Sequence, residues 1–464
     1  MGGRVMLPLL LCLSAAGPPL LVQGGDPYLF FTWNVTYGIL INNQFPGPNI
    51  NSTTNNNIVI NVFNYLDVPF LLTWNGIQHR KNSWQDGVLG TNYPIPPKTN
   101  YTYRFQVKDQ IDSYMYYPVI AMHKAAGGFV PCDDPADDYT ILAGDWFSKG
   151  HIALKKILDS GRNLGRCDGV HINGKVSKGD GKDEPLFTME PGKTYKYKIC
   201  NVRIKTALNI RFQGNNMRLV EMEGSHTMQS IVLVTANQEP MDYYVVASTR
   251  FTRQMVTATG IIRYTNGKGV ASSKLPPPPT SWAWSLNQFR TFHWNLTTSA
   301  ARPNPQGSYH YGSINITRTI KLINTAAEIS KITLDPIVLN FTYRDFIEII
   351  FENHENAIQS WHLSGYSFFA VAPEKRNNYK LLDAFSRHTI QVFPQSWATI
   401  LLTFDNCGMW NIRYEIWDRH YLGQQLYVSV LSSAHSLKDE YNMPDDSPLC
   451  GIMESMPKPQ PCNV

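Results

Sequence analysis

The chain has 464 residues, of which 43% are hydrophobic, 12% aromatic and 17% charged, with 32 glycines and 30 prolines. This length suits two to four domains, and so small a charged fraction excludes a disordered or coiled-coil protein. Lys and Arg exceed Asp and Glu by only five (41 against 36), so the charge balance gives no indication of a nucleic-acid-binding surface. The many aromatic residues and the scattered turn residues favour an all-β fold.

The N-terminal segment has the pattern of a secretory signal peptide. Arg4 is followed by an apolar run and then by small residues, so we expect residues 1–24 to be removed, with cleavage near Gly24 or Gly25. Glycine and proline interrupt the run before it reaches the length of a membrane span. No later segment predicts a transmembrane helix, and the C-terminus lacks the hydrophobic tail of a lipid-anchor signal. The predicted location is therefore extracellular, in the apoplast.

Two further features suit an oxidising, secretory environment. Six glycosylation sequons are present, at Asn34, Asn51, Asn100, Asn295, Asn315 and Asn340. Six cysteines follow the signal peptide, namely Cys132, Cys167, Cys200, Cys407, Cys450 and Cys462. We expect some of them to pair, although six cysteines allow fifteen complete connectivities and the sequence does not choose among them.

Short β-favouring runs recur in chain order, separated by turn dipeptides such as Asn173-Gly174. The clearest predicted strands are residues 57–63, 194–200 and 242–248, and long helical periodicity is scarce.

Two segments indicate domain boundaries. Residues 267–282 end in four consecutive prolines and predict a stiff linker, and a second boundary is expected near residues 133–135. The predicted domains are therefore 25–134, 135–266 and 283–464, each about the size of a β-sandwich.

Residues 73–87, Thr-Trp-Asn-Gly-Ile-Gln-His-Arg-Lys-Asn-Ser-Trp-Gln-Asp-Gly, resemble the plant ascorbate-oxidase-like branch of the multicopper oxidases. Within that branch the chain is similar to the pollen-associated and root-growth members called monocopper-oxidase-like proteins. Residues 223–226, 281–289 and 302–307 carry the same resemblance, which extends over nearly the whole mature chain. The resemblance implies three cupredoxin-like Greek-key β-sandwich domains in series.

Working members of this family hold three coppers with four His-x-His pairs, because residues i and i+2 of a strand face the same side. A fourth, electron-accepting copper takes a cysteine thiolate and two histidines. By resemblance the four pairs fall on Thr73 and Asn75, Tyr117 and Val119, His362 and Ser364, and Arg413 and Glu415. The cysteine falls on Tyr414, its partner histidines on Gln359 and Arg419, and the axial ligand on Gln424. Only His362 keeps the family's residue, and the 12 histidines include no His-x-His pair.

These replacements predict that the copper sites are lost. Hydroxyl and amide oxygens are poor substitutes for imidazole at copper, and Arg413 brings a fixed positive charge to a place meant for cations. We expect Arg413 and Glu415 to form a buried ion pair that fills this space. The alternative is a polar pocket for a small ligand that uses Arg413 and Tyr117. His362 by itself is expected to be a hydrogen-bonded core histidine. No catalytic residue and no cofactor is predicted, and copper is implied only by the resemblance.

The first functional hypothesis is a non-catalytic secreted glycoprotein whose partners are cell-wall or extracellular-matrix components, with a role in directional or tip growth implied by the resemblance. The second is an oxidoreductase with fewer coppers that oxidises ascorbate or a phenol. The third is a wall-polysaccharide-binding module that uses Trp282, Trp284 and Trp294, although we expect these tryptophans to be buried core or interdomain residues.

The resemblance also implies that this chain is shorter than its relatives. Material is missing at five places: after Gly38, Phe129, Ser230 and Lys331, and near Ala372. Tyr93 replaces a cysteine of the relatives, which would leave Cys450 without its usual partner.

Overall fold

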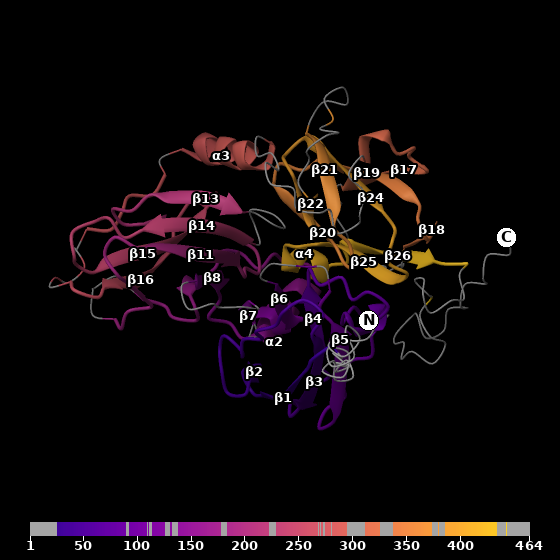
Figure 1. The fold of residues 1–464 in the computed structure, drawn as a ribbon, viewed down its shortest axis with the longest axis horizontal. Coiled ribbons are helices and arrows are strands. Elements are labelled where there is room, and N and C mark those ends of the chain that lie inside the picture. Colours follow the sequence, from indigo (N-terminus) through magenta and orange to yellow (C-terminus); the bar gives the residue numbers. More distant parts are fainter. Residues whose placement is uncertain are drawn as a thin grey trace, which may run out of the picture.

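The computed structural model describes residues 26–89, 92–108, 110, 114–125, 130–131, 138–177, 183–221, 229–267, 269, 271, 274–279, 281–294, 311–324, 337–373, 379, 386–433 and 442. Several predictions fall outside these residues: the signal peptide, the boundary near 133–135, Asn295, Cys132, Cys450 and Cys462. The described residues form three all-β domains, each with two sheets around a separate apolar core (Figure 1).

The first domain forms where apolar and polar residues alternate along short strands. Its larger sheet has the spatial order β2 (Leu40–Ile41), β1 (Tyr28–Thr36), β3 (Asn57–Asn64) and β5 (Asn100–Gln106). The smaller sheet joins β4 (Leu72–Asn75), β6 (Met115–Pro118) and β7 (Val130–Pro131). Every second residue of β3 is buried, as expected for a strand with one face on the core. Trp33, Trp74 and Tyr116 pack together between the two sheets.

The second domain has two larger sheets. One has the order β10 (Phe187–Met189), β16 (Thr257–Tyr264), β15 (Tyr243–Arg250) and β12 (Ala207–Phe212). The other joins β13 (Met217–Glu221), β14 (Gln229–Thr235), β11 (Thr194–Asn201), β8 (Asp138–Trp146) and β9 (Gly169–Ile172). The helix α2 (His151–Asp159) connects β8 to β9 and buries Leu154 and Leu158.

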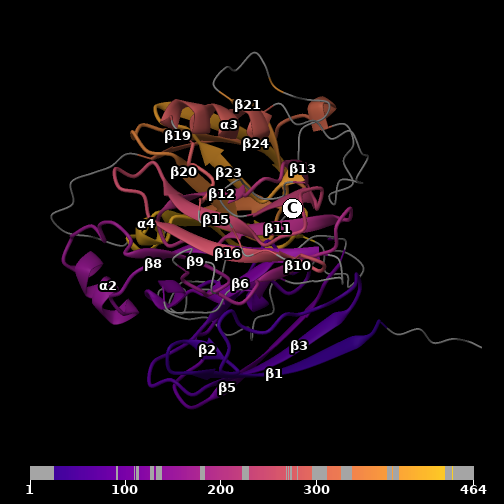
Figure 2. The ribbon, with the colours of Figure 1, turned by 90° about the vertical axis from the view of Figure 1, so that its left-hand side faces the viewer.

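The third domain repeats this plan. One sheet has the order β17 (Arg318–Asn324), β19 (Phe346–Asn353), β24 (Ser396–Thr403), β21 (Phe368–Pro373) and β22 (Ser386–Arg387). The other joins β18 (Val338–Thr342), β26 (Gln425–Leu431), β25 (Gly408–Tyr414), β20 (Gln359–Leu363) and β23 (Thr389–Val392). Figure 2 shows the strands of the first and third domains at opposite ends of the view.

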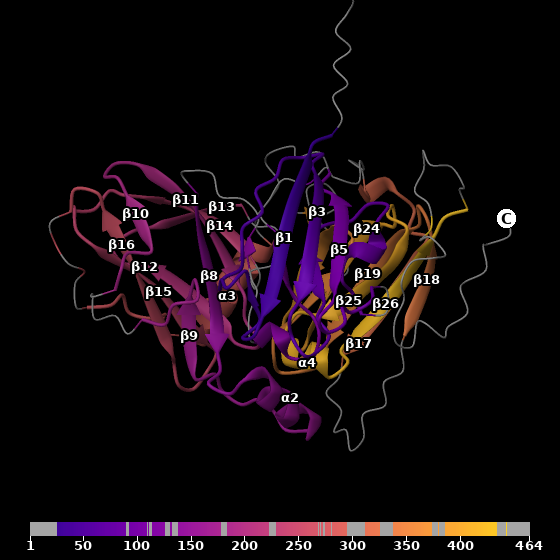
Figure 3. The ribbon, with the colours of Figure 1, turned by 90° about the horizontal axis from the view of Figure 1, so that it is seen from below.

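The short helix α4 (Trp417–Tyr421) joins all three domains. The Trp417 indole donates to the Ala121 carbonyl of the first domain at 3.1 Å, and its backbone amide donates to the Ile204 carbonyl of the second at 2.8 Å. At its other end the Tyr421 hydroxyl donates to Asp159 of α2 at 2.6 Å, and these two helices lie on the same side of the molecule (Figure 3). Helix α4 follows β25 directly, so it fixes where β25 lies against the first domain.

The strands predicted at 57–63, 194–200 and 242–248 are confirmed as β3, β11 and β15. The expected turn at Asn173-Gly174 is also confirmed, since both residues have positive φ angles (49° and 78°) that favour Asn and Gly.

The expectation that the tryptophans near residue 282 are core residues is wrong for Trp282 and Trp284. Both lie on a helix, α3 (Trp282–Trp294), and are 49% and 51% exposed. The Arg250 guanidinium donates to the Ser285 hydroxyl of this helix at 2.7 Å and to the Pro279 carbonyl just before it at 3.0 Å. Among the described residues, no helix is long and apolar enough to cross a membrane.

Candidate functional site

Two pairs of antiparallel strands bring most of the predicted copper-ligand positions together. In the first domain Thr73 on β4 lies opposite Tyr117 on β6, and in the third domain His362 on β20 lies opposite Arg413 on β25. Side-chain contacts then join β4 and β6 to the strand end of β25. Positions separated by more than 300 residues in the sequence therefore form one site between the first and third domains.

We call this site the interdomain polar cluster, and define it as Asn75, Asp86, Tyr117, Ser364, Arg413 and Glu415. Arg413 is its centre: Nη1 donates to the Ser364 hydroxyl at 2.8 Å and Nη2 donates to the Tyr117 hydroxyl at 3.1 Å. Its Nε lies 3.3 Å from Glu415 Oε1, so the expected buried ion pair is present. Asn75 Nδ2 completes the ring, donating to the Tyr117 hydroxyl at 3.1 Å and to Glu415 Oε1 at 3.4 Å.

Burial controls the electrostatics of this cluster. None of its six residues is more than 3% exposed. Burial raises the pKa of Asp86 to about 7, against the opposing effects of the Arg413 charge and of hydrogen bonds from Ser364 and the Trp74 backbone. A neutral Asp86 carboxyl would leave Arg413 and Glu415 as a balanced pair. Asn75 Oδ1, Asp86 Oδ2 and Glu415 Oε2 have no hydrogen-bond partner among the described residues.

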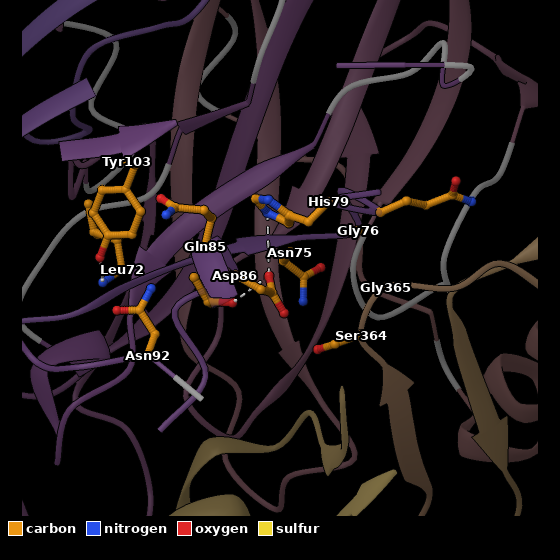
Figure 4. Close-up of polar contacts among 12 residues, drawn as sticks. Leu72, Asn75, Gly76, His79, Gln85, Asp86, Asn92, Tyr103, Ser364 and Gly365 are labelled. Carbon is orange, nitrogen blue, oxygen red and sulfur yellow. Dashed lines mark hydrogen bonds and ion pairs between the residues drawn. The ribbon is translucent and has the colours of Figure 1, made fainter. Parts of the chain in front are cut away.

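Two further contacts to Asp86 come from side chains of its own, first domain (Figure 4). Thr73 Oγ1 donates to Asp86 Oδ1 at 3.5 Å, and His79 Nε2 lies 3.6 Å from the same oxygen. Burial lowers the pKa of His79 to about 3, so its imidazole stays neutral near pH 7. The residue after Asp86 is Gly87, whose φ of +70° and close approach to the Leu72 carbonyl leave no room for a side chain.

His362 occupies a neighbouring histidine pair. It is 1% exposed, and its Nδ1 lies 3.3 Å from both Thr389 Oγ1 and His388 Nδ1. Burial and the nearby charge of Arg413 hold the pKa of His362 well below its usual value, and burial lowers the pKa of His388 to about 4. The prediction that His362 is a hydrogen-bonded core histidine is confirmed.

The positions predicted for the electron-accepting copper lie outside the interdomain polar cluster, and three of them are joined by the backbone. The Tyr414 amide donates to the Gln424 carbonyl at 3.0 Å, and the Gln424 amide donates to the Arg419 carbonyl at 3.1 Å. The Tyr414 ring packs edge-on against Trp361, with ring centroids 5.2 Å apart. Gln359 donates to Asn353 Oδ1 at 2.8 Å, and Gln424 donates to Asn324 Oδ1 at 3.3 Å. Arg419 is farther out, 3.5 Å from Glu355 and partly exposed. Val119 is the remaining position predicted for the three-copper site. It packs against an apolar cluster that includes Tyr117 and Trp417.

The donor set around these positions does not suit copper. Copper in this family's role needs imidazole nitrogens and a thiolate, whereas the interdomain polar cluster offers carboxyl, amide, phenol and guanidinium groups. Over the described part of the chain, no group of three His, Cys, Asp or Glu side chains is arranged to hold one metal ion.

Sequence reasoning missed three residues of this region. Asp86 and His79 lie inside the segment 73–87 that carried the resemblance, and only their folded proximity indicates a role. Lys124 is 3% exposed and its Nζ lies 4.1 Å from the centre of the Tyr117 ring, a cation–π contact that no sequence pattern indicates.

The outer surface carries the predicted sequons. Five of the six lie in described residues, and all five asparagines are exposed: Asn34, Asn51, Asn100, Asn315 and Asn340. Asn34 and Asn100 flank Phe63 in one row of the first-domain sheet, because Asn34 pairs with Phe63 and Phe63 pairs with Asn100. Among the described residues, Cys167 is buried and has no disulfide partner. Tyr93, which stands where the relatives are expected to have a cysteine, is exposed.

The three sandwiches and the interdomain cluster define a three-domain cupredoxin-type protein. A solved laccase from Botrytis aclada has the same fold, with a TM-score of 0.71 at 18% identity over 87% of this chain and 88% of that chain. Models described as multicopper oxidase match residues 30–132, 137–267 and 302–436. The chain belongs to the multicopper oxidase family.

Two curated plant proteins are similar over nearly the full length. The chain is 55% identical to an "L-ascorbate oxidase homolog" of Brassica napus, covering 99% of both chains. It is 41% identical to "Monocopper oxidase-like protein SKU5" of Arabidopsis thaliana, covering 94% of this chain and 91% of the other. The first alignment spans 549 positions, which exceeds the 464 residues of this chain by 85. At least 85 aligned positions are therefore gaps here, in agreement with the expected shortness.

Proposed function

We propose that this chain is a secreted, non-catalytic glycoprotein of the multicopper oxidase family that acts in the cell wall or extracellular matrix during directional growth. The observation that carries the proposal is the position of Arg413. Its guanidinium lies at a predicted copper-ligand position and bonds to three others, Tyr117, Ser364 and Glu415. A fixed positive charge there repels a copper ion and takes up the oxygen donors around it.

The surface supports the extracellular part of the proposal. Five exposed sequons are spread over the first and third domains. A rigid three-domain scaffold that presents glycans and contact surfaces needs no metal chemistry. The role in directional growth rests on the family resemblance alone.

The test is metal analysis of the full chain purified from an extracellular fraction, with oxygen consumption measured on ascorbate and on a phenol. We expect less than 0.1 copper per chain and no turnover above buffer, with a copper-loaded ascorbate oxidase as the positive control. Stoichiometric copper together with oxygen-consuming turnover would overturn the proposal in favour of the oxidoreductase. Glycosidase treatment of the same preparation is expected to lower its mass, and absence of the protein from the extracellular fraction would contradict secretion.

Wall-polysaccharide binding by the tryptophans of α3 is less well supported. Trp282 and Trp284 are exposed, but two residues apart on a helix their side chains point about 200° from one another. Trp282 also packs edge-on against Phe251, with ring centroids 6.0 Å apart. The two rings therefore do not make one flat platform for a sugar chain.

A further inference from the structure

The outer face of the first-domain sheet carries two glycosylation sequons together with aromatic side chains. Strands β1, β3 and β5 lie side by side in this sheet (Figure 3). Along β3, residues 58, 60, 62 and 64 are buried, whereas the residues that alternate with them are only partly buried and face outwards. Residues 28, 30, 32 and 34 of β1 are all exposed and form the outward set of that strand. Outward side chains of neighbouring strands therefore form rows across the sheet.

One of these rows brings Asn34, Phe63 and Asn100 together. Asn34 on β1 pairs with Phe63 on β3, and Phe63 pairs with Asn100 on β5. Residues paired in this way project from the same face, and neighbouring strands lie about 4.7–4.9 Å apart. Both asparagines are exposed, and each begins a sequon, Asn34-Val35-Thr36 and Asn100-Tyr101-Thr102. Phe63 therefore stands between two attachment points for a glycan.

Phe63 and Tyr65 form a pair of nearly parallel aromatic rings. Their centroids lie 6.2 Å apart and their planes are inclined by 19°. Tyr65 is 48% exposed, and Phe63 is only partly buried. The C–H groups of a pyranose ring carry a small positive partial charge, so a sugar packs favourably against the electron-rich faces of aromatic side chains. A sugar attached beside Phe63 thus meets a surface that suits it.

The two asparagine side chains differ in how they are held. Asn100 Nδ2, the atom that carries a glycan, donates to Asn61 Oδ1 at 2.8 Å, so this amide is directed along β3 away from Phe63. Asn34 is held through its backbone, whose N–H donates to Asn42 Oδ1 at 2.8 Å. Within the described part of the chain, no hydrogen bond fixes the side chain of Asn34. Of the two glycans, the one on Asn34 is therefore the one that can lie over Phe63.

We propose that the first N-acetylglucosamine of a glycan on Asn34 packs against Phe63 and Tyr65, so that this modification site includes a sugar-binding surface of the same chain. The inference rests on the proposed function, since it needs the chain to be glycosylated on its way out of the cell. The packed sugar covers apolar surface that otherwise faces water, which is favourable. A second protein is a poor occupant of this face, because glycans on Asn34 and Asn100 are bulky and stand between it and the sheet.

The test measures how fast peptide N-glycosidase F releases each glycan from the folded full chain. The chain is produced in a host that adds high-mannose glycans, and mass spectrometry of glycopeptides gives the occupancy and the release rate at each site. A sugar packed against the protein is open to the enzyme only when that contact breaks. We expect release from Asn34 to be about tenfold slower than from Asn100 in the folded chain, and equal at both sites after denaturation. Equal rates in the folded chain would overturn the proposal.

The variant Phe63→Val decides whether the aromatic ring protects the sugar. Valine also favours β-strands, and Phe63 is partly exposed, so the variant should fold. Serine or threonine at position 63 would create a new sequon at Asn61, which valine avoids. We expect release from Asn34 to become about tenfold faster, with no change at Asn100. An unchanged rate at Asn34, or equal acceleration at both sites, would contradict the assignment.

Further measurements separate other causes of slow release. Asn100→Gln removes the neighbouring glycan and should leave release from Asn34 slow; fast release would mean that this glycan, and not Phe63, shields the site, and the proposal would fail. Asn340, an exposed sequon residue that pairs with Ser429 and not with an aromatic residue, is the control and should be released as fast as Asn100. An unoccupied Asn34 beside glycans elsewhere would overturn this inference and leave the proposed function intact. Absence of a glycan from every sequon would contradict the proposed function as well.

Discussion

The first domain makes two polar interfaces, and they are built differently. Against the third domain, four side chains bond to one another: Arg413, Glu415, Tyr117 and Asn75. Against the second domain, Lys124 and His171 line a cavity of about 280 Å³, and the His171 Nδ1 has no partner among the described residues. Lys124 touches both interfaces, because its ammonium lies over the Tyr117 ring.

The first interface is dominated by polar groups that bond to one another, whereas the second encloses a cavity. A buried ion pair with its hydrogen bonds made mainly resists the loss of either partner. A buried polar group that faces an open space leaves its desolvation cost unmet until a ligand arrives. The interface at the predicted copper positions contains such an ion pair, together with Asn75 Oδ1, Asp86 Oδ2 and Glu415 Oε2, which have no partner among the described residues. At the cavity, the comparable atom is His171 Nδ1. Three predictions test this contrast, and a fourth concerns the exposed helix α3.

The largest effect is expected for Arg413→Met. It leaves the buried Glu415 carboxylate without its ion-pair partner, which typically costs about 3–5 kcal/mol in the free energy of unfolding. Urea denaturation measures it. The double variant R413M/E415Q should be more stable than Arg413→Met alone. Lys155→Met, which breaks an exposed ion pair with Asp159, is the control and should cost less than about 0.5 kcal/mol. A loss below about 1 kcal/mol for Arg413→Met would show that the cluster does not stabilise the interface.

Asp86→Asn should change the pH dependence of stability. The folded pKa of Asp86, about 7, lies above its ordinary value of 3.8, so the folded state binds the proton more tightly. Ionisation of Asp86 therefore destabilises the fold as pH rises from about 4 to 7, and this loss then levels off. Relative to the wild type, Asp86→Asn should gain stability between pH 5 and pH 7, measured by urea denaturation at each pH.

The comparison with the variant is necessary because the buried histidines act in the opposite sense. The pKa values of His79 and His388 are lowered to about 3 and 4, so their contribution to stability is lost as pH falls below 6.5. Asp159→Asn, at an exposed carboxylate whose pKa is lowered by Lys155, is the control and should show no pH-dependent difference between pH 5 and 7. The same flat result for Asp86→Asn would contradict the burial argument.

A smaller effect is expected at the cavity. His171→Leu removes a ring whose Nδ1 has no partner, so the free energy of unfolding should change by about 1 kcal/mol or less. Ser364→Ala removes a hydroxyl that accepts from Arg413 and should cost about 1.5–3 kcal/mol. If the two costs are equal in denaturant titrations, the contrast between the interfaces fails.

The smallest effect is expected for Trp284→Ala. Trp284 is half exposed on α3, and such surface substitutions usually stay within about 0.5 kcal/mol. Trp410→Ala is the comparison, because Trp410 is fully buried and its indole donates to the Asn406 carbonyl at 2.9 Å; it should cost about 3–5 kcal/mol. A melting temperature that falls equally for both would mean that α3 is part of a core.

Local patterns were sufficient for much of the fold. The alternation in residues 194–200 predicted β11, and Asn173-Gly174 predicted a turn, because a strand or a turn depends on neighbouring residues. Helix α3 was missed, since its many aromatic residues show no clear amphipathic period. Trp282 and Trp284 were expected to be core or interdomain residues because they are large aromatic side chains, although both are exposed.

At the predicted copper-ligand positions, too, some features were indicated by the sequence and others were shown only by the structure. Composition alone shows that no His-x-His pair exists among 12 histidines, and the segment 73–87 was enough to indicate the family. The buried pair of Arg413 and Glu415 was also expected, because the resemblance places both residues at copper-ligand positions. Asp86 and Lys124 were not, because each acquires its role from residues that are remote in the chain or on another strand.

The sequence by itself determined the alternating strands, the turns and the residue types available at each copper-ligand position, since these depend on local order and on chemistry. Only the tertiary structure decided that Asn75 meets Glu415 across 340 residues and that Lys124 and His171 share a cavity. The physical reason is that burial and partnership are properties of packed domains. A charge is stabilised or left without a partner according to what the fold brings beside it.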